Sequence, residues 1–255
     1  MKRTVLAALG ILFIIGLATV LAVAATFYSI FGHSVAMQTG DAVGPATTIV
    51  DGYAAAFSIP TDSGVILVDA GVDPEATAII DALSDQGFAP SDVKALFITH
   101  GHGDHIAGAM TLGAPVYAMS EEVDLIEGRQ ASDSTVGRLF GPNEPGTEVA
   151  HSLSDGESLT IDGVEVLALH VPGHTQGSAV YVIGDVAFLG DSATAHDDGT
   201  IVGAVGIFSE DLKQNAQELR DLARRLPPQV DQLAFGHSGA APVEQLGAFA
   251  RTVPD

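Results

Sequence analysis

Apolar runs of strand length, bounded by Gly, Pro, Asp or Ser, recur along most of this 255-residue chain. Such runs predict β-strands, because the bounding residues favour turns. They lie at residues 53–59, 65–71, 93–99 and 114–119, with strand–turn–strand pairs at 157–173 and 178–191 and a last apolar run at 230–239. Turn residues at 60–64 and at Asp162-Gly163 predict hairpins.

Helical patterns fall between these runs. Asp73 and Pro74 have the residue types of an N-cap and a first helical position, so a helix is predicted from there to about Gln86. Residues 128–146 are polar and rich in Gly and Pro, which predicts a partly helical insertion or a mobile loop. Antiparallel hairpins mixed with helices favour an α/β fold of two sheets covered by helices. Further helices are predicted at 105–112, 120–127 and 209–226, and near the C-terminus.

The N-terminus has a separate apolar pattern. Lys2 and Arg3 are followed by residues 4–31 without a charged residue, which is long enough to cross a bilayer as a helix. We therefore predict that residues 1–33 are a transmembrane anchor or a signal segment, the latter cleaved near residues 22–25. The two bases place the rest of the chain outside, either anchored to the membrane or secreted or periplasmic after cleavage.

Charge and cysteine content exclude several classes of function. The chain has 32 acidic and 10 basic residues, so its surface repels phosphate backbones and nucleic acid is not an expected partner. It has no cysteine, which excludes disulfides, thiolate ligands and a cysteine nucleophile.

A cluster of metal-ligand residue types follows the apolar run at 93–99. His100, His102, Asp104 and His105 fall within six residues and are separated by glycines, which allow the chain to bend tightly around an ion. Imidazole and carboxylate ligands without thiolate suit zinc, and also iron or manganese. The sequence therefore predicts a metal site here.

Four further residues end apolar runs elsewhere in the chain. His174 and His237 each lie beside a glycine in a loop that follows a predicted strand. Ligands commonly bind at such strand ends in α/β folds. Asp191 could bridge two metal ions with one carboxylate. Asp69 is interpreted as an acceptor that orients a ligand histidine without binding the metal itself.

These segments, taken together, resemble the motifs of the metallo-β-lactamase superfamily, in the usual order and from about Thr47 to the C-terminus. The resemblance implies a four-layer αββα sandwich over residues 34–255, with the site at one edge of the paired sheets. The matching segments are THGHGDH (99–105), VDAG (68–71), PGHTQGS (172–178), LGDS (189–192) and GHSG (236–239).

The resemblance also implies two divalent ions, with zinc expected first and iron or manganese as alternatives. One ion is expected on His100, His102 and His174, and the other on Asp104, His105 and His237. Asp191 is expected to bridge both.

The expected function is metal-dependent hydrolysis of an ester, thioester or lactone by a metal-bridging hydroxide, with Asp104 as the catalytic residue that handles its proton. Residues 128–146 and the apolar segment 193–206 would form the walls for a small neutral or apolar acyl substrate. A mono-iron, persulfide-type dioxygenase, a β-lactamase and a non-catalytic metal-binding module are the alternatives. Asp191 resembles the thioesterase, lactonase and general hydrolase branches, and the absence of cysteine excludes the cysteine-ligand β-lactamases.

Overall fold

The computed structural model describes residues 16, 28, 32–143 and 146–254. Residues 35–255 form one compact unit. No helix within the described residues is long and apolar enough to cross a membrane. The predicted N-terminal transmembrane helix lies outside the described residues and stays a prediction.

The first sheet has seven strands in the order of the sequence. Strands β1 to β4 are antiparallel neighbours, whereas β4 to β7 are parallel. Parallel neighbours end at the same edge of a sheet, so the segments that follow β4, β5 and β6 lie close together. The strands are β1 (Ala42–Val43), β2 (Ala46–Asp51), β3 (Ala54–Pro60), β4 (Val65–Val68), β5 (Val93–Phe97), β6 (Val116–Met119) and β7 (His151–Leu153).

The second sheet has six strands in the order β15-β14-β11-β10-β9-β8. Only β11 and β14 are parallel in it, so their carboxyl ends share an edge. A separate antiparallel pair consists of β12 and β13. The strands are β8 (Glu157–Ile161), β9 (Val164–His170), β10 (Ala179–Ile183), β11 (Val186–Phe188), β12 (Ala193–Ala195), β13 (Ile201–Gly203), β14 (Gln232–Ala234) and β15 (Ala241–Pro242).

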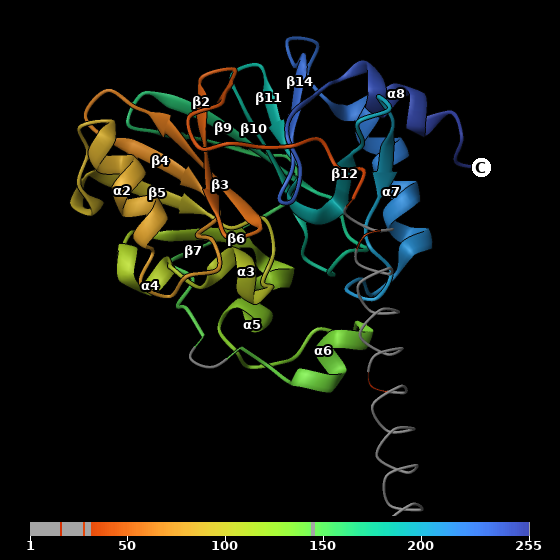
Figure 1. Ribbon diagram of the computed structural model, residues 1–255, viewed down its shortest axis with the longest axis horizontal. Helices are drawn as coiled ribbons and strands as arrows, with labels where there is room; N and C mark the ends of the chain where they lie inside the picture. The colour runs from red at the N-terminus through yellow and green to blue at the C-terminus, as the bar shows by residue number, and fades with distance from the viewer. Residues whose placement is uncertain (1–15, 17–27, 29–31, 144–145, 255) are drawn as a thin grey trace, which may run out of the picture. The chain divides into compact units, whose positions relative to one another are not determined.

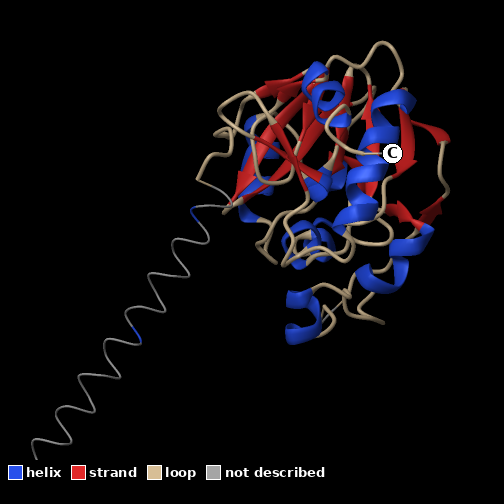
Figure 2. Cartoon of the chain, turned by 90° about the vertical axis from the view of Figure 1, so that its right-hand side faces the viewer, coloured by secondary structure: helices blue, strands red, loops and turns tan. Residues whose placement is uncertain are grey.

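The two sheets pack face to face, with α2 and α4 on the outer side of the first sheet and α7 and α8 on the outer side of the second (Figure 1). Figure 2 shows the same strands enclosed by helices in a second view. The α/β sandwich is therefore confirmed. Within residues 32–143 and 146–254 the helices are α2 (Thr77–Asp85), α3 (Gly103–Ile106), α4 (Ala109–Leu112), α5 (Val123–Ile126), α6 (Thr135–Phe140), α7 (Leu212–Arg225) and α8 (Glu244–Ala250), with short 3₁₀ turns at Pro90–Asp92, Ser120–Glu122 and Gly190–Ser192.

The period-two alternation of the strands produces these layers. Along β10, Ala179, Tyr181 and Ile183 point into the core between the two sheets. Val180 and Val182 point to the opposite face, into the core beneath α7 and α8. Because both faces of this strand are covered, all five of its residues are apolar and buried.

Local predictions had mixed outcomes. The Asp162-Gly163 hairpin is confirmed, because both residues have the positive φ angles, 46° and 85°, that a type I′ turn requires. The predicted N-cap at Asp73 is wrong, because α2 begins at Thr77. The Asp73 carboxylate instead accepts hydrogen bonds from the backbone N–H groups of Glu75 and Thr77, closing a turn before the helix.

Candidate metal centre

The predicted ligand residues come from four loops at one edge of the paired sheets. His100 and His102 follow β5, and Asp104 and His105 belong to the short helix α3. The other loops supply one residue each: His174 between β9 and β10, Asp191 after β11, and His237 after β14. All seven lie in three overlapping groups whose ligand atoms are within 4.8 Å of one another.

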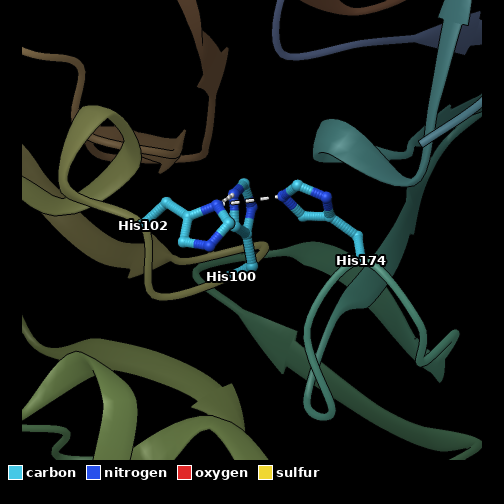
Figure 3. A group of neighbouring side chains, drawn as sticks. All are labelled: His100, His102 and His174. Carbon is cyan, nitrogen blue, oxygen red and sulfur yellow. Dashed lines mark hydrogen bonds between the residues drawn. The ribbon is translucent and has the colours of Figure 1, made fainter. Parts of the chain in front are cut away.

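The first group consists of three histidines. Figure 3 shows the rings of His100, His102 and His174 pointing toward one another from two separate loops. The Nδ1 atom of His102 lies 3.1 Å from Nε2 of His100 and 3.0 Å from Nε2 of His174. Three ring nitrogens therefore meet at one point.

Hydrogen bonds behind the rings fix which nitrogens can donate. The Ser209 hydroxyl donates to the Val205 carbonyl, so it accepts from Nδ1–H of His174. The Thr99 hydroxyl donates to the Asp69 carboxylate and so accepts from Nδ1–H of His100. The Nε2 atoms of both histidines are thus lone-pair acceptors on the inner side.

The two facing Nε2 lone pairs need a hydrogen-bond donor or a cation between the rings. In its neutral form, His102 could donate one proton from Nδ1, which satisfies only one of the two facing Nε2 lone pairs. A cation placed among the three nitrogens would satisfy all of them. The donor set of this group therefore fits a metal ion, and its imidazole composition suits zinc.

The second group consists of Asp104, His105 and His237, together with the carboxylate of Asp191, which it shares with the first group. Nε2 of His237 lies 3.0 Å from Oδ2 of Asp191 and 3.3 Å from Oδ2 of Asp104. Nε2 of His105 and Oδ1 of Asp191 are buried, lie 3.4 Å apart and have no hydrogen-bond partner among the described residues. Buried polar atoms in native proteins are normally paired, so these two also fit a metal ion.

Asp191 lies between the two groups. Its Oδ2 atom is 4.0 Å from Nε2 of His100 and 3.8 Å from Nε2 of His174, as well as in contact with His237. One carboxylate therefore faces both groups, and the geometry accommodates a pair of ions that share it.

Asp69 contacts the ring of His105 at its Nδ1 atom, and its role in orienting a metal ligand stays a prediction. It is buried, and its carboxylate accepts a hydrogen bond from Nδ1–H of His105 at 2.8 Å. It also accepts from the backbone and the hydroxyl of Thr99, which in turn contacts His100. His237 is oriented differently, because its Nδ1–H donates to the backbone carbonyl of Tyr53.

The two groups differ electrostatically in the metal-free protein. Burial and repulsion by His102 lower the pKa of His174 to about 3, and burial also lowers the pKa of His100 and His102. Burial acts in the same direction on His237, but Asp191 and Asp104 outweigh it and raise the pKa to about 10. Asp191, Asp69 and Asp104 likewise raise the pKa of His105.

The carboxylates of the second group are correspondingly acidic. Burial raises the pKa of Asp104, but His105 and His237 outweigh that effect and hold it at about 2. The same two imidazoles hold the pKa of Asp191 well below its ordinary value, again against burial. The first group is therefore neutral at pH 7, whereas the second contains ionised carboxylates beside imidazolium groups.

Two residues around the site were missed by the sequence reasoning. Glu122 is 1% exposed and follows β6, where the parallel arrangement brings it beside the His100 loop. Burial raises its pKa to about 7, against the hydrogen bonds that it accepts. Tyr53 is 65% exposed and its ring stacks on that of His237 at 5.8 Å. Glu122 fell inside the predicted helix 120–127 and Tyr53 opened the predicted strand 53–59, so neither position carried a signal of a role at the site.

The segment 128–146 is anchored beside the first group. It contains α6, as the partly helical prediction expected, and its Asn143 side chain donates to the Gly101 carbonyl at 2.6 Å. At its other end, Glu210 accepts hydrogen bonds from Ser132 and from the backbone of Asp133. The segment is thus tied directly to the loop of His100 and His102. It is tied to the His174 loop only through Glu210, whose backbone N–H donates to the carbonyls of Gly173 and His174.

The apolar residues of segment 193–206 do not indicate a wall for an apolar substrate, as the sequence had suggested. Its apolar residues Ala193, Ala195 and Ile201 are buried in the core beneath α7 and α8. Their apolar character is explained by that packing, so it carries no information about a substrate.

Comparisons with known proteins give the same architecture. The family model of the metallo-beta-lactamase superfamily matches residues 50–237. A hydroxyacylglutathione hydrolase from Xanthomonas euvesicatoria pv. vesicatoria is 34% identical over 135 residues, which are 52% of this chain and 44% of that protein. The probable polyketide biosynthesis zinc-dependent hydrolase BaeB from Bacillus velezensis is 28% identical over 187 residues, covering 71% and 72% of the two chains.

The chain spans about half the length of the hydroxyacylglutathione hydrolases that it matches. Among solved structures, the Rm3 metallo-beta-lactamase has a TM-score of 0.66 at 20% identity and covers 86% of this chain and 91% of its own. A metallo-beta-lactamase family protein from Thermus thermophilus has a TM-score of 0.61 at 22% identity and covers 81% and 78%. At these identities the structures show a shared fold.

Proposed function

Because this chain belongs to the metallo-β-lactamase superfamily, we propose that it is a binuclear zinc hydrolase that cleaves an ester, a thioester or a lactone. The observation that carries the proposal is the convergence of unpaired ring lone pairs and a shared carboxylate at one edge of the two sheets. The names of two relatives, a hydroxyacylglutathione hydrolase and a zinc-dependent hydrolase, support the reaction class.

In this proposal the seven predicted side chains hold two ions. His100, His102 and His174 would hold one, Asp104, His105 and His237 would hold the other, and Asp191 would serve both. A pair of such ions lowers the pKa of a water molecule from about 15.7 to near 7, which supplies a nucleophile at neutral pH.

The chain's own residues orient the reactants. Asp104 is ionised at neutral pH and 23% exposed, so its carboxylate can accept a hydrogen bond from the attacking water and pass the proton to the leaving group. The proton acceptor thus lies at the solvent-facing side of the second group. Asp69 and the Tyr53 carbonyl keep His105 and His237 in fixed orientations during this transfer.

Substrate contacts are proposed on two surfaces. Tyr53 presents an exposed ring beside His237, and α6 carries Leu139 and Phe140, which are 76% and 79% exposed. In this proposal these apolar side chains contact the substrate, because Asn143 of the same segment is bound to the loop of His100 and His102. They support a small neutral or apolar acyl group.

The test is an activity screen of full-length protein after metal stripping and reloading with two equivalents of zinc. The panel contains esters, thioesters, lactones and β-lactams. We expect turnover of at least one ester, thioester or lactone, and its loss in His102→Ala and Asp104→Asn. His151→Ala removes an exposed histidine outside the site and is the matched control.

Metal analysis of anaerobically purified protein separates this proposal from an oxygenase. Two zinc ions per chain agree with the hydrolase. One iron per chain, together with no cleavage of any compound in the panel, would refute it.

A further inference from the structure

Glu122 joins two loops of the candidate metal centre through one buried carboxylate. It ends the 3₁₀ turn Ser120–Glu122 after β6 and is 1% exposed. Its Oε1 atom accepts a hydrogen bond from the backbone N–H of Gly101 at 2.7 Å. Its Oε2 atom accepts one from the backbone N–H of Gly177 at 2.8 Å. The two oxygens thus hold two segments that are far apart in the sequence.

These two segments supply all three histidines of the first group. Gly101 lies between His100 and His102, and Gly177 lies in the same loop as His174. The carboxylate of Glu122 therefore spans the loops on either side of the proposed ion. The carboxylate also accepts a hydrogen bond from the side chain of Thr175, the neighbour of His174. The described contacts of Glu122 do not include the histidines themselves, so any influence on the metal must pass through the chain around Gly101 and Gly177.

The Gly101 loop approaches α5, and the Gly177 loop approaches the turn, so closely that only glycine fits. A Cβ atom at Gly101 would lie 2.7 Å from Cγ of Leu125, and one at Gly177 would overlap Glu122. The Gly101 peptide is also held from the opposite side, because its carbonyl accepts from Asn143. The spacing between the two loops is therefore fixed by contact and by hydrogen bonds from both directions.

A carboxylate is an unfavourable group to bury, and burial accordingly raises the pKa of Glu122. Only a carboxylate offers acceptors on both oxygens. A glutamine of the same size has one acceptor and one amide NH₂, which would face one of the two N–H groups donor to donor. The ionised group is thus required for both bonds to form.

We propose that Glu122 is a positioning residue for the metal subsite of His100, His102 and His174, because it sets the distance between the two loops that carry them. This inference rests on the proposed metal site and is independent of the substrate. The residue holds ligand-bearing backbone in place and does not touch the ion or the reacting atoms.

The experiment compares Glu122→Gln with Glu121→Gln in full-length protein. Glu121 is the exposed neighbour in the same turn and serves as the matched control. Zinc affinity of the first subsite is measured by competition with a chromophoric chelator, and its geometry by the visible absorption of the cobalt-substituted form. We expect Glu122→Gln to weaken zinc binding about 10–100-fold and to alter the cobalt spectrum, because supporting groups of this kind have such effects. Glu121→Gln should match the wild type.

Unfolding temperatures distinguish positioning from a general structural role. If Glu122→Gln lowers them equally with and without zinc while zinc affinity and the cobalt spectrum stay unchanged, the proposal is overturned. A wild type that binds no zinc overturns both this inference and the proposed function.

If Glu122→Gln does not fold, amide hydrogen exchange of the zinc-loaded wild type tests whether the two hydrogen bonds to Glu122 hold the loops. Protection of the Gly101 and Gly177 amides supports the proposal. Exchange at the rate of exposed loop amides contradicts it.

Discussion

The opposite pKa shifts of the two histidine groups predict that the two zinc ions bind with different pH dependence. In the metal-free protein, His174 has a pKa of about 3 and is neutral at pH 7. The pKa of His100 and His102 is also lowered. Zinc therefore displaces no proton from the first group at pH 7, and its affinity there should be nearly constant between pH 7 and 9.

The second group must lose a proton before it can bind zinc. His237 has a pKa of about 10 in the metal-free protein, about three pH units above neutral. Displacing that proton at pH 7 costs about 4 kcal/mol, at about 1.36 kcal/mol for each pH unit. Zinc affinity of this group should therefore rise about tenfold per pH unit between pH 7 and 9, and more steeply if His105, whose pKa is also raised, loses a proton as well.

The sign of the stability effect follows from the same shift. A histidine whose pKa is raised by folding stabilises the metal-free protein below its unfolded pKa of about 6.5, and this contribution is lost as pH rises toward 10. The unfolding temperature of the metal-free protein should thus fall between pH 7 and 10, because this contribution to the free energy of unfolding is lost. The zinc-loaded protein should not show this loss, because its imidazoles are already deprotonated.

The assay is stepwise zinc titration against a chelator at pH 7, 8 and 9, with calorimetry in buffers of different ionisation enthalpy to count released protons. The first ion should release none at pH 7, and the second should release one or two. The first subsite is an internal control for effects of pH on zinc itself. Equal proton release for both ions, or greater release for the first, would refute the electrostatic reasoning.

Three further substitutions test other parts of the structure. Asp69→Asn should weaken zinc binding of the second group about 10–100-fold, because one amide oxygen cannot replace both Oδ1, which accepts from the Thr99 backbone N–H, and Oδ2, which accepts from His105; an unchanged chelator-competition result would contradict this. Tyr53→Ala should raise KM while leaving kcat within about twofold if the exposed ring contacts substrate, and steady-state kinetics with an unaltered KM would exclude the contact. Phe188→Ala should lower the free energy of unfolding by about 3–5 kcal/mol, since this ring is fully buried between the sheets; a loss below about 1 kcal/mol in urea titration would contradict the packing.

Much of this fold could be predicted from local patterns. The apolar runs became strands because both faces of each central strand are covered, which leaves a continuous apolar signal such as that of β10. Turn chemistry was also readable where it requires a particular backbone, as at Asp162-Gly163. The start of α2 was misplaced because Asp73 has the same residue type as an N-cap but closes a turn before the helix.

The candidate site was predictable only as far as residue type indicates chemistry. Histidines and aspartates at strand ends indicate metal binding, and the structure brings all seven together, whereas their roles as ligands stay a prediction. Glu122 contacts the site through backbone N–H groups, and Tyr53 lies at the surface beside His237. Both positions depend on which strands are neighbours in the sheet, and local sequence patterns do not give that order. The apolar residues of 193–206 were interpreted as a substrate wall. Burial beneath α7 and α8 requires the same apolar composition, so composition alone could not distinguish the two.

The difference between the two histidine groups follows from which side chains stand behind the rings. The first group is backed by hydroxyls, from Thr99 and Ser209, which accept a hydrogen bond without adding charge. The second is surrounded by carboxylates that raise imidazole pKa and would also attract a divalent ion. Protons on His105 and His237 therefore balance the same negative charge that zinc would balance. A site of this kind is expected to fill in a fixed order at neutral pH, with the neutral group first, because only the second ion must compete with protons.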